Sequence, residues 1–195
     1  VLDAVGVAAN TIVIFLSDNG MAFPFSKTNC YLHSTKTPWI MRWPAVIAPG
    51  TVDSEHFISG IDLLPTLLEI AGIDGPDGVD GRSFLPLLRG ANQAGREYVF
   101  TQFHQTAGKR NYPMRCIQNK DYGYIFNPWS NGERIFRNES QAGRTFAAMQ
   151  AAADDERIAA RVKLFLNRVP EELYHFGNDP DALEKWRIRY LGSKG

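Results

Sequence analysis

The feature that most constrains the fold is an apolar, β-branched run that ends abruptly in polar and small residues. Residues 11–16 read TIVIFL, and Ser17-Asp18-Asn19-Gly20 follows at once. Continuous apolarity without alternation predicts a strand that is buried on both faces, as in a sheet covered by helices. In such α/β sheets, ligands bind at the carboxyl ends of the strands, so the side chains that follow this run are candidate ligands.

Two of these side chains have the chemistry of a metal site. Asp18 and Asn19 place a carboxylate beside a carboxamide, and both supply the hard oxygen atoms that Ca²⁺ or Mg²⁺ takes. Asp-Asn-Gly is equally ordinary turn chemistry after a strand. The residues by themselves therefore leave a metal site and a plain turn both open.

The pattern of predicted elements changes near residue 92. Before it we expect a helix end at 1–9, a second strand at 37–43, a helix within 58–71, a loop at 74–81 and a short helix at 83–89. After it we expect strands at 98–103, 114–118 and 122–126, one or two helices within 144–168, and a strand with an Asp-Pro turn at 171–181. This predicts an α/β fold with two parts: residues 1–92 in a sheet flanked by helices, and residues 93–195 in a smaller α+β subdomain with antiparallel strands.

Composition excludes several classes of partner. Lys plus Arg and Asp plus Glu number 21 each, so no basic excess points to nucleic acid or to a membrane surface. No apolar run approaches the length of a membrane-spanning helix. The two cysteines, Cys30 and Cys116, do not make a disulfide framework. They could pair once or stay free, and we expect free, buried thiols.

The residues around the strand end resemble the sulfatases of the alkaline-phosphatase-like superfamily. After Ser17-Asp18-Asn19-Gly20 come Lys27, Tyr31 and Pro38 at the spacings of that family. Further matches follow in order at 42–44 (RWP), 49–50 (PG), 61–68 (IDLLPTLL), 71–72 (AG), 81–83 (GRS) and 85–88 (LPLL). The chain is most similar to the sulfamidase branch, through 23–24 (FP), 27–29 (KTN) and 112–115 (YPMR).

The resemblance implies a hydrolase of sulfate esters, or of N-sulfates, on a sulfated sugar. It assigns Asp18 and Asn19 to a Ca²⁺ ion, which two further aspartates from an earlier strand end would also hold. It assigns Lys27 to the sulfate group as the catalytic cation. His104 and His33 are then candidate substrate-binding residues, whereas His56 and His175 are expected to be structural or solvated.

The family nucleophile lies in Cys/Ser-x-Pro-x-Arg and is converted to formylglycine, and neither Cys30 nor Cys116 has this context. By resemblance we expect the chain to be the C-terminal portion of a sulfatase, inactive alone and partnered by the N-terminal half of the same enzyme. A homo-oligomer is left open, and an exported, periplasmic or lysosome-like setting rests on the resemblance alone. Two alternatives remain: a phosphodiesterase or phosphonate hydrolase of the same superfamily, and a non-catalytic binding fragment.

Overall fold

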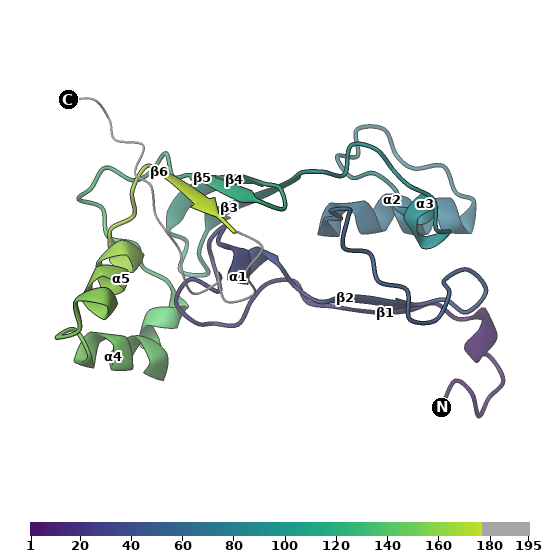
Figure 1. Cartoon of the computed structure of the whole chain (residues 1–195), viewed down its shortest axis with the longest axis horizontal. Helices are drawn as coiled ribbons and strands as arrows, with labels where there is room; N and C mark the ends of the chain where they lie inside the picture. Colours follow the sequence, from purple (N-terminus) through teal and green to yellow (C-terminus); the bar gives the residue numbers. More distant parts are fainter. Residues whose placement is uncertain (177–195) are drawn as a thin grey trace. The chain divides into compact units, whose positions relative to one another are not determined.

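Two compact units make up the chain, and the computed structural model describes residues 1–176 of it (Figure 1). The first unit consists of Val1–Asp18 and Pro38–Val99; the second consists of Asn19–Thr37 and the described residues from Phe100 onward. The candidate strand end therefore divides between the units, with Asp18 in the first and Asn19 in the second. A domain boundary at residue 92 stays a prediction.

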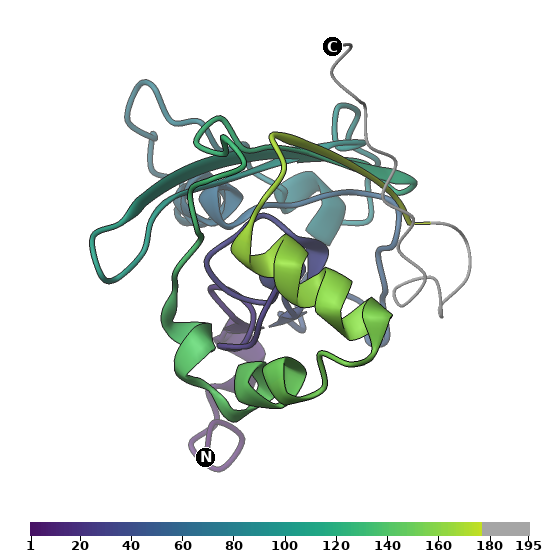
Figure 2. The same cartoon turned by 90° about the vertical axis from the view of Figure 1, so that its left-hand side faces the viewer.

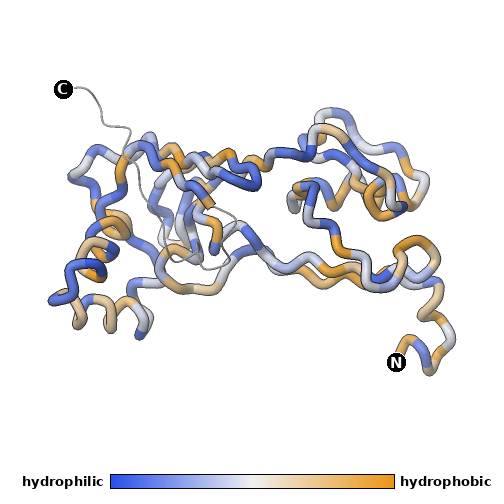
Figure 3. The backbone as a smooth tube through the Cα atoms, in the orientation of Figure 1, coloured by the Kyte–Doolittle hydropathy of each residue, from blue (hydrophilic) through white to orange (hydrophobic). Residues whose placement is uncertain are grey.

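The first unit contains a two-stranded antiparallel sheet. Strands β1 (Val13–Leu16) and β2 (Trp39–Arg42) pair with Val13 opposite Arg42 and Leu16 opposite Trp39. Both predicted strands are confirmed, but the predicted burial of the first is wrong. Side chains of β1 are largely exposed, Phe15 by 61%, and hydrophobic residues run along both strands (Figure 3). Burial on both faces requires surrounding strands and helices, whereas among the described residues β1 pairs with β2 alone.

The helices of this unit follow the predicted pattern. A 3₁₀ turn η2 (Gly60–Asp62) leads into α2 (Leu63–Ala71), and α3 (Leu85–Leu88) follows the loop. Pro65 lies in the first turn of α2, where its missing N–H costs nothing. Gly72 ends the helix at φ 66°, a left-handed conformation that glycine adopts without steric cost. Residues 1–9, expected to end a helix, contain only the start of a short 3₁₀ turn, η1 (Ala8–Asn10).

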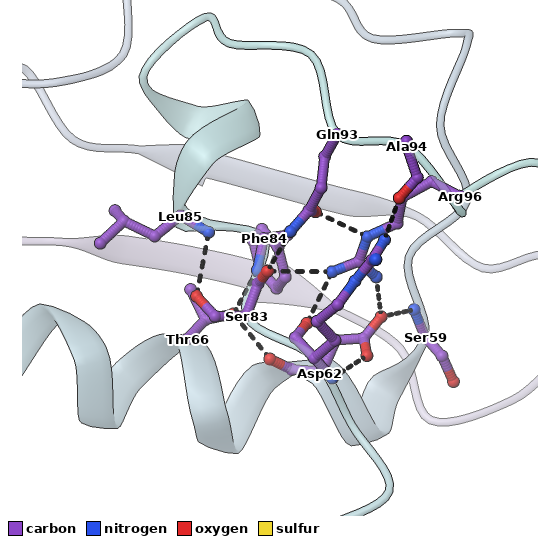
Figure 4. Close-up of polar contacts among 10 residues, drawn as sticks. Ser59, Asp62, Thr66, Ser83, Phe84, Leu85, Gln93, Ala94 and Arg96 are labelled. Atoms are coloured by element: carbon purple, nitrogen blue, oxygen red, sulfur yellow. Dashed lines mark hydrogen bonds and ion pairs between the residues drawn. The ribbon is translucent and has the colours of Figure 1, made fainter. Parts of the chain in front are cut away.

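A buried ion pair joins α2 to the segment beyond the loop. The Asp62 carboxylate accepts from Arg96 Nη1 at 2.5 Å, from the Arg82 backbone N–H at 2.8 Å and from the Ser59 backbone N–H at 2.9 Å (Figure 4). Arg96 Nη2 also donates to the Arg82 and Ser83 carbonyls, at 2.6 and 3.0 Å. Asp62 and Arg96 are each about 95% buried. The network replaces hydration that both charges lose, so removing one partner would leave the other as an uncompensated buried charge.

A histidine near the surface of the same unit is bonded through both ring nitrogens. His56 Nε2 lies 2.6 Å from Asn92 Oδ1, and His56 Nδ1 lies 2.9 Å from Asp53 Oδ2. The hydrogen bond to Asn92, followed by that to Asp53, raises the pKa of His56 above its ordinary value. The expected structural role for His56 agrees with these contacts.

The raised pKa of His56 gives a prediction for pH dependence. The contribution of His56 to stability is fully present below its unfolded pKa and is lost as pH rises through the raised folded pKa. In an NMR titration of the ring protons, we expect a midpoint above that of His56 in an unfolded peptide of the same sequence. Asp53→Asn should lower the midpoint and Asp74→Asn, in the exposed loop, should not. A wild-type midpoint at or below the peptide value would contradict the contacts.

The second unit is an antiparallel sheet with helices on one face. Its strands lie in the order β3 (Val99–Gln105), β4 (Asn111–Gln118), β5 (Tyr122–Phe126) and β6 (Glu171–His175). The predicted hairpin at β4 and β5 is confirmed, as are two helices within 144–168: α4 (Arg144–Ala151) and α5 (Glu156–Leu166). Figure 2 shows α5, in light green, below the curved sheet. The predicted Asp-Pro turn at 179–180 and the closing residues 186–195 lie outside the described residues.

The core of this unit includes an unexpected segment, residues 19–37. Phe25, Cys30 and Tyr31 pack there with residues of the sheet and of α4 and α5. The Tyr31 hydroxyl donates to Glu172 Oε2 at 2.7 Å, and the Tyr174 hydroxyl donates to the same buried carboxylate. Segment 19–37, with its short helix α1 (Leu32–Thr35), is thereby fixed to β6.

Both cysteines are free and buried, as expected. Burial raises the pKa of the Cys30 thiol to about 11 and that of Cys116 to about 12. Both thiols are therefore protonated at neutral pH, and the thiolate is the nucleophilic form. Neither cysteine is suited to nucleophilic catalysis. Among the described residues, no helix has both the length and the apolarity needed to cross a membrane.

Candidate functional site

Segment 19–37 folds back on itself at Gly20. The Gly20 N–H donates to the Ser34 carbonyl at 3.1 Å, and a Cβ on Gly20 would lie 2.1 Å from each of the Ser26 and His33 carbonyl oxygens. Only glycine permits this approach of three backbone stretches. The structure thus brings the start of the segment next to the residue before Lys27 and next to His33.

Gly20→Ala tests this close approach. The added methyl group meets two backbone oxygens that belong to packed segments, so we expect unfolding to become easier by about 3 kcal/mol. Urea denaturation of the chain, followed by tryptophan fluorescence, measures the change. Gly108→Ala is the matched control, because the nearest atom to its Cβ is 3.8 Å away. Equal stabilities for the two variants would contradict the packing at Gly20.

Left-handed backbone occurs on both sides of Lys27. Phe25 has φ 66° and Thr28 has φ 58°, values that cost a non-glycine residue about 1–3 kcal/mol. The Phe25 ring is held by the Arg161 guanidinium, whose central carbon lies 4.5 Å from the ring centroid, and by edge contacts with Tyr31 and Phe165, each with centroids 5.2 Å apart. Asn138 Nδ2 donates to Thr28 Oγ1 at 2.5 Å. The second unit therefore holds the strained turn that presents Lys27.

Lys27 itself is half-buried and paired. Its Nζ lies 3.6 Å from Glu139 Oε1, and its carbonyl accepts from Asn29 Nδ2 at 2.8 Å. Glu139 begins the 3₁₀ turn η3 (Glu139–Ala142). Sequence reasoning missed Glu139 because it follows Lys27 by more than a hundred residues and no motif includes it.

The candidate metal ligands lie at the end of β1. Asp18 is exposed and Asn19 is half-buried. Their two oxygen-bearing side chains fit a Ca²⁺ ion by donor type, but Ca²⁺ takes six to eight oxygen ligands. Among residues 1–176 there is no group of three or more His, Cys, Asp or Glu side chains that could hold a metal. The described residues can therefore supply part of a coordination shell.

The two candidate substrate-binding histidines lie on different elements of the second unit. His33 is exposed on α1, and its carbonyl lies against Gly20. His104 is exposed on β3, where its Nε2 lies 3.3 Å from Gln102 Oε1. The structure thus brings Asn19, Lys27 and His33 into one folded segment, and His104 belongs to the sheet that supports it.

Comparison with known proteins places the chain among sulfatase sequences. Residues 21–134 match the family model described as N-sulphoglucosamine sulphohydrolase, C-terminal. An ulvan-active sulfatase of Formosa agariphila is 34% identical over 173 residues, which is 88% of this chain and 32% of that protein. Human N-acetylglucosamine-6-sulfatase is 37% identical over 203 residues, which is 97% of this chain and 36% of that protein.

Solved structures share the fold. A 2-O GAG sulfatase superposes with a TM-score of 0.58 at 24% identity, covering 87% of this chain and 41% of the other. The expected fold class, part of an alkaline-phosphatase-like fold, is confirmed. The chain spans about a third of the length of the curated relatives named above.

Proposed function

Because the chain belongs to the N-sulphoglucosamine sulphohydrolase C-terminal family of sulfatases, we propose that it forms part of a hydrolase that removes sulfate from a sulfated sugar. The observation that carries the proposal is Lys27, which a strained and well-packed turn presents in the segment that folds back on itself at Gly20, the residue after Asn19. We propose a sulfated sugar as the substrate because the names of the matched family and of the human relative both refer to one.

The reaction needs positive charge next to the sulfuryl group that is transferred. Hydrolysis breaks the bond between sulfur and the ester oxygen, or the sulfamate nitrogen; the nucleophile takes up the sulfuryl group, and water in turn releases that group as sulfate. The leaving atom keeps the bonding electron pair and takes a proton. Negative charge grows on the leaving atom or on the sulfuryl oxygens in the transition state, and an ammonium group already in place stabilises that charge.

Each candidate residue then contributes to binding the substrate, to binding the metal or to stabilising charge. The Lys27 ammonium faces the sulfate group, and the Asp18 and Asn19 side chains contribute to a calcium site. A bound Ca²⁺ would supply a fixed positive charge beside the sulfuryl oxygens. His33 and His104 bind hydroxyl or sulfate groups of the sugar. The remaining calcium ligands and the nucleophile come from an upstream half of the same enzyme, which is the proposed partner of this chain.

The test uses the protein together with that upstream segment. We expect release of sulfate from 4-nitrophenyl sulfate or from N-sulfoglucosamine, with loss on chelation and recovery with added Ca²⁺. Hydrolysis of a phosphodiester or a phosphonate ester without sulfatase activity would favour the alternative enzyme class. No hydrolysis of any of these substrates would favour a non-catalytic fragment. In calorimetry, the present chain alone should bind Ca²⁺ weakly or not at all.

A further inference from the structure

A carboxylate stands next to the proposed sulfate-binding cation. Glu139 Oε1 lies 3.6 Å from Lys27 Nζ, with 35% of the Glu139 side chain and 37% of the Lys27 side chain exposed. The separation exceeds a hydrogen bond, so the ammonium keeps its three N–H donors available to an anion. An acidic neighbour weakens the affinity of a cation for an anionic ligand. The position of Glu139 next to Lys27 therefore calls for an explanation other than tighter binding.

The residues on both sides of Glu139 are fixed to the Lys27 turn or to each other. Asn138 Nδ2 donates to Thr28 Oγ1 at 2.5 Å and to the Lys27 carbonyl at 3.4 Å. Ser140 is buried, and its Oγ donates to Asn138 Oδ1 at 2.7 Å. The backbone that carries Glu139 is therefore attached to the turn that carries Lys27. Their pairing is a product of this attachment rather than of two free surface side chains.

The electrostatic consequence depends on the charge of the ligand. An anion that contacts Nζ on the side away from Glu139 lies about 7 Å from the carboxylate. At an effective dielectric constant of about 40, the repulsion weakens binding of the anion roughly tenfold for each unit of negative charge that it carries. A sulfate monoester carries one negative charge. A phosphate monoester carries nearly two above its second pKa of about 6. The carboxylate therefore penalises the phosphate ester about ten times more than the sulfate ester.

We propose that Glu139 is a specificity-determining residue that makes the Lys27 site prefer singly charged sulfuryl groups to doubly charged phosphoryl groups. The proposal rests on the proposed function, because it requires that Lys27 meets the transferred group. Glu139 acts through the field at Lys27 and takes no part in bond making.

Glu139→Gln tests this role in the protein with its upstream segment, at pH 8. The measured quantity is kcat/KM for 4-nitrophenyl phosphate divided by kcat/KM for 4-nitrophenyl sulfate. We expect this ratio to rise about tenfold. Glu133→Gln, an exposed glutamate of the same unit, is the matched control and should leave the ratio unchanged. A ratio within twofold of wild type, whether or not both activities fall, would overturn the proposal.

A second measurement covers the case in which the phosphate ester is not turned over. Inorganic phosphate, which carries nearly two negative charges at pH 8, is then used as a competitive inhibitor of sulfate-ester hydrolysis, and Glu139→Gln should lower its inhibition constant about a hundredfold. An unchanged inhibition constant would overturn the proposal. Failure of the proposed function would be recognised by a different result, because the wild-type protein would then release no sulfate at all.

Discussion

Lys27→Ala is expected to lower kcat/KM for a sulfate ester by a factor of about 10²–10³. Losing one preorganised group that stabilises charge in a transition state typically costs this much. The loss should appear in kcat as well as in KM, because the interaction strengthens as charge develops. Steady-state kinetics with 4-nitrophenyl sulfate measures both constants. Lys27→Arg should retain more activity than Lys27→Ala, since a guanidinium keeps the charge in the same turn.

The control for this prediction lies in the same segment. Lys36 is exposed one residue beyond α1, so Lys36→Ala removes the same functional group at a solvated position and should change kcat/KM by less than twofold. Lys27→Ala should change the free energy of unfolding by at most about 1 kcal/mol, because both side chains of its ion pair with Glu139 are about a third exposed and water screens the attraction between them. A Lys27→Ala variant with activity within threefold of wild type would remove Lys27 from the catalytic site.

Local sequence patterns predicted the elements whose stability is local. The hairpin of β4 and β5 has Asn119 in its turn, and Asn119 Oδ1 accepts from the Asp121 and Tyr122 backbone N–H groups. The helix α2 combines a proline in its first turn with a glycine stop. Each of these signals acts over a few residues, so it can be read without knowledge of the rest of the fold.

Burial depends on partners that a strand's own residues do not specify. The run at 11–16 has the composition of a strand covered on both sides, and β1 nevertheless exposes Val13, Phe15 and Leu16. Segment 19–37 shows the opposite case. It is rich in loop-forming residues, yet Phe25, Cys30 and Tyr31 belong to the core of the second unit. Composition describes what a segment can bury, whereas the tertiary neighbours decide whether it does.

Some residues of the candidate site could be predicted from the sequence, and others could not. Asp18, Asn19 and Lys27 are predicted from the resemblance to sulfatases, whose motif lies within eleven residues of the end of one strand. Glu139 and Asn138 reach Lys27 and Thr28 from the far end of the sequence, and their contacts arise only after the second unit has folded. Residues that tune a catalytic group through long-range contacts leave no pattern in a single sequence.

Asp62→Ala is expected to destabilise the chain by about 3–5 kcal/mol, because it leaves the buried Arg96 guanidinium without its counter-charge. The Arg82 and Ser59 backbone N–H groups lose their acceptor at the same time. Urea denaturation measures the change, and Asp74→Ala in the exposed loop should stay within about 0.5 kcal/mol of wild type.

A double variant separates the destabilisation caused by an unpaired buried charge from the stabilisation that the ion pair itself contributes. In Asp62→Ala with Arg96→Met, no unpaired charge remains buried, so the double variant should be more stable than the sum of the two single losses predicts. A coupling of about 2 kcal/mol or more is expected for groups 2.5 Å apart and about 95% buried. Strictly additive losses would mean that Arg96 reaches water once Asp62 is gone. In that case the pair would not be what anchors α2 to the chain beyond the loop.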